Sequence, residues 1–186
     1  MHHDVCPWWL GYVLASPLRK LITNPSVILT PFVHEGMTVL EPGPGMGFFT
    51  LEMARLTGPK GRVVAVDIQQ EMLDTLKRRA ERKGFGSRIE LRRANADGMG
   101  IEDLKGKVDF ILAFAVVHEL PDSGRFFEES FAALRPGSKV LFSEPANHIA
   151  PSEFDTSLDL ARHAGFVISA RPEVRSNHSA LLVKMA

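Results

Sequence analysis

The 186-residue chain holds a single cysteine and a single tyrosine, and its formal net charge at pH 7 is zero. One cysteine cannot form an internal disulfide, so we expect the protein in a reducing compartment, the cytoplasm. No apolar run approaches the ~20 residues that a helix needs to cross a bilayer, and no signal-peptide pattern opens the chain. The composition, 45% hydrophobic and 24% charged, is that of a globular domain with its own core.

The zero net charge conceals a division along the chain. Residues 55–93 are predominantly basic, whereas residues 98–160 are predominantly acidic. The basic runs 77–79 and 82–83 lie on a predicted helix, but no aromatic residues alternate with them, so nucleic acid is not an expected partner. We interpret these runs as a solvated helix face. A second interpretation, that the charge division serves contacts in a homodimer, stays open.

From residue 37 onward, short β-branched runs alternate with segments of helical periodicity. This order is typical of βαβ units and predicts a parallel sheet with helices on both faces. The tail differs, because the strand-like runs 165–174 and 178–185 are separated so closely that they predict an antiparallel hairpin. The other predicted strands are 37–41, 62–67, 88–93, 108–113 and 138–143, and the predicted helices are 47–57, 69–83, 123–134 and 153–163.

The first 36 residues differ from the rest in their concentration of aromatic side chains. Trp8, Trp9 and Tyr12 cluster among apolar residues, and such a cluster must be buried against something. Asn24 followed by Pro25 predicts a helix start, with proline at the first helical position. Two interpretations of the cluster stay open: a lid over a ligand site, or packing against the helices of the sheet.

The most informative segment is the run of residues 39–50, VLEPGPGMGFFT. Two apolar residues end a predicted strand, and Glu41 follows. Three glycines then occupy every second position, with a proline between the first two: Gly43, Pro44, Gly45 and Gly47. Glycine lets a ligand approach the backbone closely and lets the chain adopt positive φ, while the free N–H groups of the next helix favour an anion. The segment predicts a turn that binds a cofactor with an anionic group and a ribose.

The glycine spacing distinguishes two nucleotide-binding motifs. The dinucleotide fingerprint G-x-G-x-x-G needs a third glycine where Phe48 or Thr50 stands, which disfavours an NAD-dependent oxidoreductase. Twenty residues beyond Gly47, a second predicted strand ends at Asp67, whose carboxylate can accept hydrogen bonds from both ribose hydroxyls. The pattern E-x-G-x-G-x-G with this acid resembles the first motif of the class I S-adenosylmethionine-dependent methyltransferases.

The resemblance continues, in the family's order, over residues 37–144. Residues 89–97 resemble the third strand and the adenine-contacting motif, with Ala94 in place of the family's glycine and Asn95 in place of its aspartate. An asparagine oxygen can still accept a hydrogen bond from the adenine amino group. Residues 108–114, 116–122 and 134–142 resemble the fourth strand, the h-x-H-x-L-P-D segment after it and the turn into the fifth strand. The subgroup that the chain resembles is the ubiquinone/menaquinone C-methyltransferase-like small-molecule enzymes.

This resemblance implies both a fold and an activity. The expected fold is α/β, a Rossmann-like doubly wound, mostly parallel seven-stranded sheet with helices on both faces and a C-terminal antiparallel hairpin. The expected organisation is one class I methyltransferase domain over residues 1–186, with 1–36 as a lid or helical segment and 37–186 as the cofactor-binding core. The expected activity is transfer of a methyl group from S-adenosylmethionine to a small-molecule acceptor by in-line displacement, leaving S-adenosylhomocysteine.

The resemblance also assigns residues to the methionine end of the cofactor. The N–H groups of Gly45 and Gly47, with the helix at 47–57, would face its carboxylate. The carbonyls of Gly43 and Ala113, with Glu41 behind them, would face its ammonium group.

At the adenosine end, Asp67 would hold the ribose. Ile68 and Met99 would sandwich the adenine, with plain core packing as the alternative. Asn95 and Ala96 would bind the edge of the ring. The complete set of expected cofactor-binding residues is Glu41, Gly43, Pro44, Gly45, Gly47, Asp67, Ile68, Asn95, Ala96, Met99 and Ala113.

A general base is needed only when the acceptor must lose a proton. His118 is the catalytic candidate, because it lies just past the fourth predicted strand, at the carboxyl edge of the sheet where ligands bind. A helix-capping or structural role is the alternative. Glu119, Glu144 and His148 share that edge and are weaker candidates.

No metal site is expected, because Cys6 with His2, His3 and Asp4 matches no standard zinc spacing. The single cysteine also argues against the multi-cysteine chemistry of arsenic methylation. Residues 113–116 lack an N-P-P-Y-type tetrapeptide, which argues against amino-methylation of nucleic-acid bases. Two further functions stay open: a methyltransferase acting on a protein or nucleic acid, and a cofactor-binding protein of this fold without turnover.

Overall fold

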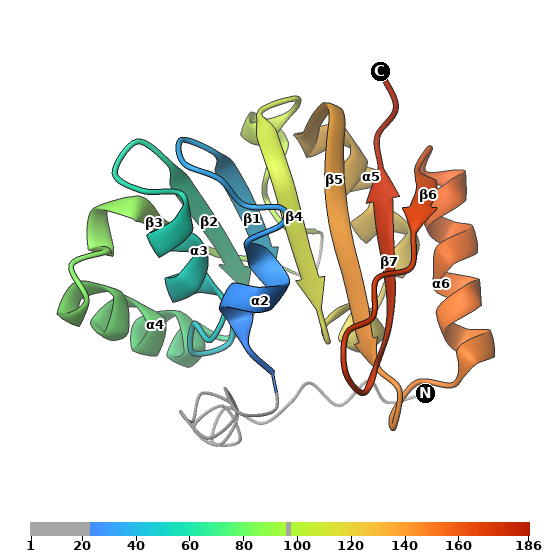
Figure 1. The fold of residues 1–186 in the computed structure, drawn as a ribbon. Coiled ribbons are helices and arrows are strands. Elements are labelled where there is room, and N and C mark those ends of the chain that lie inside the picture. Colours follow the sequence, from blue (N-terminus) through green and yellow to red (C-terminus); the bar gives the residue numbers. More distant parts are fainter. Residues whose placement is uncertain (1–22, 96–97) are drawn as a thin grey trace. The chain divides into compact units, whose positions relative to one another are not determined.

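The computed structural model describes residues 23–95 and 98–186 (Figure 1). These residues form two compact units, here called the N-terminal unit (23–95 and 98–100) and the C-terminal unit (101–186). The predicted aromatic lid, the Cys6 segment with its histidines, and Ala96 lie outside the described residues.

The N-terminal unit is built on three parallel strands in the order β3-β2-β1. In β2, four consecutive residues from Val63 to Val66 are buried, which is the pattern of a parallel strand covered on both faces. The predicted helix start at Asn24 is confirmed, because its side chain accepts a hydrogen bond from the Ser26 N–H at 3.0 Å. The elements are α2 (Pro25–Leu29), β1 (Thr38–Pro42), α3 (Thr50–Leu56), β2 (Arg62–Asp67), α4 (Gln70–Arg82), η2 (Gly86–Arg88) and β3 (Ile89–Arg93).

The C-terminal unit has four strands in the order β4-β5-β7-β6. β4 and β5 are parallel, whereas β7 runs antiparallel to both of its neighbours. The elements are η3 (Glu102–Leu104), β4 (Val108–Phe114), η4 (Val117–Glu119), α5 (Ser123–Ala133), β5 (Leu134–Pro145), α6 (Pro151–His163), β6 (Val167–Ala170) and β7 (Asn177–Val183).

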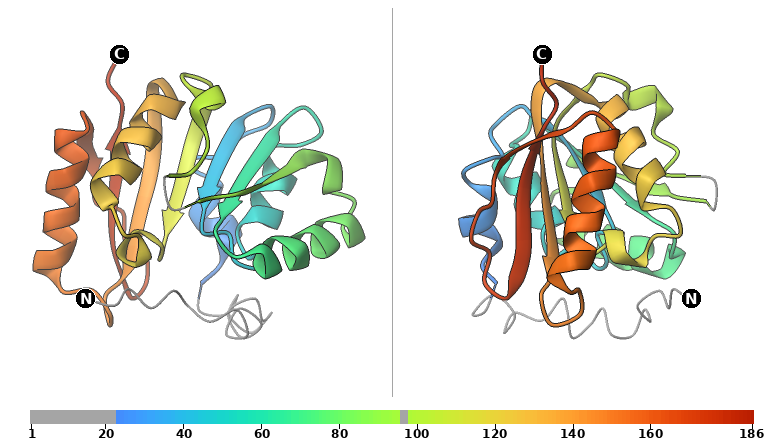
Figure 2. Two further views of the ribbon diagram at one scale, coloured as in Figure 1. Left: turned by 180° about the vertical axis from the view of Figure 1, so that it is seen from behind. Right: turned by 90° about the vertical axis from the view of Figure 1, so that its right-hand side faces the viewer.

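Aromatic rings fill the core of the C-terminal unit. The ring of Phe142 on β5 packs edge-on against Phe127, with 5.5 Å between centroids, and stacks on Phe154 at 4.8 Å. Because Phe127 belongs to α5 and Phe154 to α6, both helices cover the same face of β5, as Figure 2 also shows. This packing fixes the strand that carries Glu144.

The predicted fold class is confirmed: the described residues hold seven mostly parallel strands, with helices between them and an antiparallel hairpin at the C-terminal end. Among these residues, no helix has the length and apolar character needed to cross a membrane.

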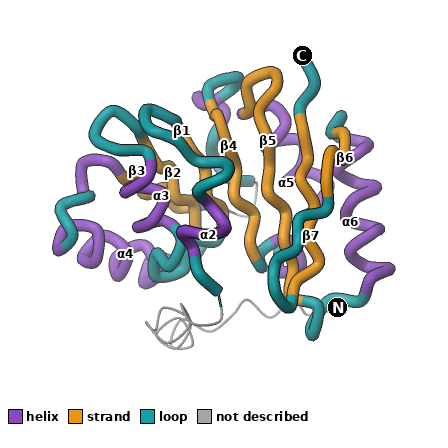
Figure 3. Tube along the Cα trace, viewed as in Figure 1, coloured by secondary structure: helices purple, strands orange, loops and turns teal. Residues whose placement is uncertain are grey.

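Three predicted elements have a boundary that differs from the observed one by three residues or more; Figure 3 shows the helices and strands as the structure has them. The helix predicted at 47–57 begins at Thr50, because the glycines before it adopt positive φ and form a turn. The fifth strand begins at Leu134 instead of 138, because Leu134 already pairs with Val108 ahead of a register shift in β4. The strand predicted at 165–174 is confined to β6, and Pro172 beyond it has no N–H to donate to a ladder.

Candidate functional site

The loop between β1 and α3 adopts a conformation that favours glycine at three positions. Gly43, Gly45 and Gly47 have φ values of 65°, 52° and 85°, a region that side-chain-bearing residues rarely occupy. The Gly43 N–H donates to the Val66 carbonyl of β2 at 2.9 Å, which ties the loop to the neighbouring strand. The glycine at every second position of the sequence motif therefore corresponds to a positive φ at every second residue of the loop.

The last two of these glycines differ in their surroundings. A Cβ added to Gly47 would overlap the Leu76 Cδ1 of α4, so this glycine allows the loop and the helix to pack closely. A Cβ added to Gly45 would meet no atom within 4 Å. Of these two positions, Gly45 thus has room for a ligand beside it.

The N–H groups predicted to face a carboxylate have internal partners in this structure. The Gly47 N–H donates to the Pro44 carbonyl at 2.9 Å, and the Gly45 N–H forms a hydrogen bond with the Asp67 carboxylate. Since α3 begins only at Thr50, its first turn lies three residues beyond Gly47. An anion bound by these groups would have to replace the internal hydrogen bonds, and the assignment of Gly45 and Gly47 stays a prediction.

Asp67 ends β2 and is 8% exposed. Its Oδ1 accepts a hydrogen bond from the Gln69 N–H at 2.9 Å. Burial raises the pKa of this carboxyl, while backbone hydrogen bonds from Gln69, Gly45 and Ile68 act in the opposite direction. The Asp67 carboxylate at the end of β2 thus accepts a hydrogen bond from the glycine loop, and this contact connects the two predicted motifs.

Glu41 is a buried carboxyl group with little to compensate its charge. It is 3% exposed, and its Oε2 accepts a hydrogen bond from the Thr50 hydroxyl at 2.5 Å. Burial, opposed by that hydrogen bond and reinforced by the charge of Asp67, raises the pKa of Glu41 to about 8. No lysine, arginine or histidine in the described part of the chain forms an ion pair with it. Such a group favours a cation placed beside it.

The residues predicted to hold an adenine have different exposures. Ile68, next to Asp67, is 48% exposed, whereas Met99 is buried. Asn95 lies at the same edge, because the Ala94 N–H donates to the Asp67 carbonyl at 3.0 Å and Asn95 follows directly. The exposure of Ile68 is consistent with a side chain that a ligand covers. The burial of Met99 is consistent both with adenine contact and with the alternative, core packing.

Ala113 and His118 belong to the C-terminal unit. Ala113 is fully buried on β4 and pairs with Phe142 of β5. His118 lies in η4, the short turn that follows β4. His148 lies on the exposed turn after β5, and its backbone N–H donates to the Pro145 carbonyl.

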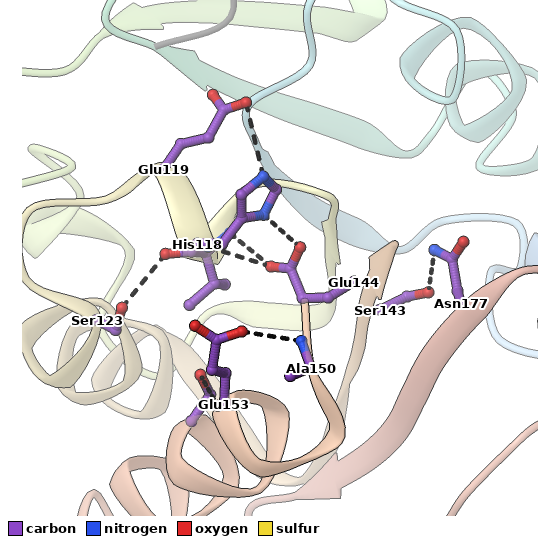
Figure 4. A network of polar contacts seen from close by, with 10 residues as sticks. His118, Glu119, Ser123, Ser143, Glu144, Ala150, Glu153 and Asn177 are labelled. Atoms are coloured by element: carbon purple, nitrogen blue, oxygen red, sulfur yellow. Dashed lines mark hydrogen bonds and ion pairs between the residues drawn. The ribbon is translucent and has the colours of Figure 1, made fainter. Parts of the chain in front are cut away.

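The structure joins His118 to Glu144, one of the weaker sequence candidates (Figure 4). The His118 Nδ1 lies 2.6 Å from the Glu144 Oε2, and Glu144 is 2% exposed. The other oxygen of Glu144 accepts the N–H groups of Val117 at 2.8 Å and of His118 at 3.3 Å. On the far side of the imidazole, Nε2 lies 3.9 Å from the Glu119 Oε1.

The hydrogen bond to Glu144 is the main cause of a raised pKa at His118. Partial burial of the ring acts against it, and the negative charges of Glu144 and Glu119 add to it. An imidazole held in this way accepts a proton more readily than a free histidine.

The sequence interpretation missed one contact, made by Arg79. This residue was assigned to a solvated helix face, but its side chain is half-buried and its Nη1 donates to the Met46 carbonyl inside the glycine loop. Burial lowers the pKa of Arg79. The available signal was its spacing, since Arg79 is three residues beyond the buried Leu76 on α4 and so borders the apolar face.

Within the described residues, no three histidine, cysteine, aspartate or glutamate side chains gather as a metal site would require. The cysteine-containing segment that was weighed as a metal site lies outside those residues.

Comparison with known proteins gives a consistent result. A family described as "Methyltransferase domain" matches residues 33–168. A ubiquinone/menaquinone biosynthesis C-methyltransferase from Hahella chejuensis is 32% identical over 126 residues, which cover 66% of this chain and 50% of that protein. An arsenite methyltransferase from Halobacterium salinarum is 30% identical over 135 residues, covering 73% of this chain and 34% of that protein. The chain thus spans half or less of the length of these curated relatives.

Among solved structures, a SAM-dependent methyltransferase from Aquifex aeolicus superposes with a TM-score of 0.85 at 23% identity. The match covers 97% of this chain and all of the other. This likeness extends the shared fold beyond the segment that the family match covers.

Proposed function

Because the chain belongs to the class I S-adenosylmethionine-dependent methyltransferase family, we propose that it transfers a methyl group from S-adenosylmethionine to a small-molecule acceptor. The cofactor would be held at the glycine loop of the N-terminal unit. When bound, it supplies a methyl group on a positively charged sulfur, which is already activated for displacement. The protein then has to position the two reactants in line and to exclude water.

The buried carboxyl of Glu41 is the observation that best supports this proposal. A carboxyl group held in an apolar environment without a cationic partner costs stability, and it is therefore expected where a ligand brings the missing charge. The ammonium group of the cofactor's methionine part has that charge. The open space at Gly45, directly along the loop, provides the close approach that such a ligand needs.

The adenosine part is proposed to lie along the carboxyl edge of β2 and β3. Asp67 would accept hydrogen bonds from the ribose hydroxyls, and the exposed Ile68 would pack on the adenine. Asn95 and Ala96 would bind the edge of the ring, and Met99 would close the other side. These roles come from the family resemblance, and the shared edge in the N-terminal unit supports them for Asp67, Ile68 and Asn95.

In the C-terminal unit, His118 is proposed as the catalytic base. It follows a parallel strand at the carboxyl edge, the position at which α/β folds bind their ligands. A base at this position would remove a proton from the acceptor as its nucleophilic atom attacks the methyl carbon. Because the cofactor would supply a leaving group that is neutral as a thioether, no residue would have to act as an acid toward it.

A small-molecule acceptor is favoured by the names of the relatives, which include a quinone-biosynthesis C-methyltransferase and arsenite methyltransferases. The single cysteine of this chain favours the former kind of acceptor over arsenite. A protein or nucleic-acid acceptor, and cofactor binding without turnover, are the alternative functions. We propose a cytoplasmic location, in keeping with the single cysteine of the sequence.

Calorimetry with S-adenosylhomocysteine and with NADH tests the cofactor assignment. We expect S-adenosylhomocysteine to bind and NADH not to bind. Asp67→Ala should weaken that binding by about 1–3 kcal/mol, the scale of lost hydrogen bonds to a charged group. Asp74→Ala, on the exposed side of α4, is the matched control and should leave the affinity unchanged. Tighter binding of NADH, or an unchanged affinity in Asp67→Ala, would contradict the proposal.

A further inference from the structure

We propose, building on the methyl-transfer function proposed above, that Glu144 is a positioning residue that keeps His118 Nε2 free to take a proton. The acceptor would then belong to a definite chemical class, in which the attacking atom itself carries a proton: a hydroxyl group or an acidic carbon. An acceptor whose attacking atom carries no proton, such as trivalent arsenic, needs no such base.

The first step of the argument is the orientation of the imidazole. Glu144 Oε1 already accepts two backbone N–H groups, from Val117 and His118. In its ionised form Glu144 has only acceptor sites to offer, so in its 2.6 Å contact with the ring the proton belongs to Nδ1. In the neutral ring, the unprotonated nitrogen is consequently Nε2.

The second step is the position of that nitrogen. Nε2 forms no hydrogen bond with another described residue, and the side chain of His118 is 26% exposed, whereas Glu144 is almost entirely buried. Figure 4 shows the ring with its Nδ1 edge turned to Glu144 and its opposite edge turned away toward Glu119. The basic nitrogen thus faces outward from the buried carboxylate, as a base that must meet a substrate does.

The third step is the rigidity of the turn. Ala115, just before η4, has a φ of 54°, a strained conformation for a residue with a side chain. It is held there by the hydrogen bond from its N–H to the Ser143 carbonyl, at 2.8 Å. Ser143 and Glu144 together therefore fix the turn from the end of β5. A turn that only connects β4 to α5 has no need of a strained residue and a buried carboxylate.

The reaction balances with these groups alone. The bond between the acceptor atom and its hydrogen breaks, and the proton passes to His118 Nε2. The electron pair left on the acceptor forms the new bond to the methyl carbon, while the pair of the sulfur–methyl bond stays on sulfur. The resulting imidazolium lies between Glu144, at Nδ1, and Glu119, at Nε2. In the described part of the chain, these are the two charged groups whose negative charge stabilises it. It then releases its proton to solvent.

Nuclear magnetic resonance of protein labelled with ¹⁵N-histidine tests the positioning role, with the His118 signal assigned by its loss in His118→Gln. We expect the neutral ring to carry its proton on Nδ1. In Glu144→Gln, the amide can present an N–H to the ring, so the proton should move to Nε2 and the pKa of His118 should fall. Glu119→Gln is the matched control: it should lower the pKa while leaving the proton on Nδ1. A wild-type neutral ring protonated at Nε2, or a tautomer unaffected by Glu144→Gln, would overturn the proposal.

Methyl transfer tests the acceptor class. S-adenosylmethionine with a ¹⁴C-methyl group is incubated with a bacterial metabolite extract or with sodium arsenite. Label transfer to organic products of the extract should rise with pH as His118 loses its proton, and should fall about 100-fold in both His118→Gln and Glu144→Gln. Methylation of arsenite in preference to the extract, or transfer that is equal in wild type and Glu144→Gln, would overturn the proposal. Binding of S-adenosylhomocysteine should be the same in all variants. If the wild type did not bind S-adenosylhomocysteine, the cofactor assignment would be refuted instead.

Discussion

At the scale of single residues, Glu41 has a measurable consequence for stability. Its pKa is about 8 in the folded protein, against 4.5 for an ordinary glutamate side chain. The folded state thus holds a proton that the unfolded state releases between these pH values, and the free energy of unfolding falls as the pH rises through this window. The fall from this one group is of the order of 3–5 kcal/mol when the pH exceeds the folded value.

Glu41→Gln should remove that pH dependence. Glutamine keeps an oxygen that accepts the Thr50 hydroxyl, and it has no charge to bury. We expect the variant without ligand to be more stable than the wild type at pH 8 and the two to converge near pH 4.5, as measured by urea unfolding at several pH values. Glu71→Gln, on the exposed side of α4, should run parallel to the wild type. A constant difference across the pH range would exclude a titration of Glu41.

Cofactor binding should also release a proton from Glu41. At pH 7 the carboxyl is mostly protonated, and an ammonium group placed beside it lowers its pKa. Calorimetric titration with S-adenosylhomocysteine in phosphate and in Tris should therefore give different observed enthalpies, since the two buffers take up a proton with different heats. The same titration of Glu41→Gln should show a much smaller difference. Equal enthalpies for the wild type in both buffers would show that Glu41 does not lie beside the ammonium group of the ligand.

At the scale of elements, the glycine loop offers a matched pair of variants. Gly47→Ala introduces a Cβ where Leu76 already packs, in addition to an unfavourable φ, and should destabilise the fold by about 1–3 kcal/mol. Gly45→Ala meets no neighbour, so its cost should be limited to the strained φ, about 1–2 kcal/mol. The affinity for S-adenosylhomocysteine should show the reverse order, with the larger loss in Gly45→Ala. Thermal unfolding and calorimetry on both variants decide the matter, and a larger affinity loss in Gly47→Ala would contradict the assignment of the open position.

The elements also show what sequence reasoning can and cannot reach. The buried strands were predictable because Val63, Val64 and Val66 form a continuous apolar run, and Asp67 was predictable as the polar residue that ends it. The start of α3 was not, because the backbone cost of three positive φ values delays the helix beyond Gly47. The contacts of Arg79 with Met46 and of Glu144 with His118 join residues 33 and 26 positions apart. Local spacing can place Arg79 beside the apolar face of α4, but no local pattern specifies the distant residue that it contacts.

At the scale of the whole molecule, ligand binding should act on one unit in particular. The residues proposed to bind the cofactor lie mainly between Glu41 and Met99, in the N-terminal unit. We expect S-adenosylhomocysteine to slow amide hydrogen exchange in the glycine loop and at the ends of β2 and β3, with much less effect on the β6–β7 hairpin. Mass spectrometry of peptic fragments measures this directly. Protection concentrated in residues 167–183 would place the ligand elsewhere.

The overall architecture was the most predictable level. The alternation of apolar runs and helical segments predicted the mostly parallel strands, and the short link at residues 175–177 predicted the hairpin; both are confirmed. A homodimer that uses the opposed charges of the two halves stays a prediction. Sedimentation at two salt concentrations would test it, since exposed charge pairs weaken as salt increases.

The buried carboxyl of Glu41 also bears on how long the protein survives in a cell. A fold that is weakened while its methyl donor is absent, and strengthened when the donor binds, spends more time unfolded during scarcity. Proteases remove unfolded chains continuously, and a change of 1–2 kcal/mol is enough to alter abundance several-fold. The amount of this protein would therefore follow the supply of the donor, with no regulator other than its own folding equilibrium.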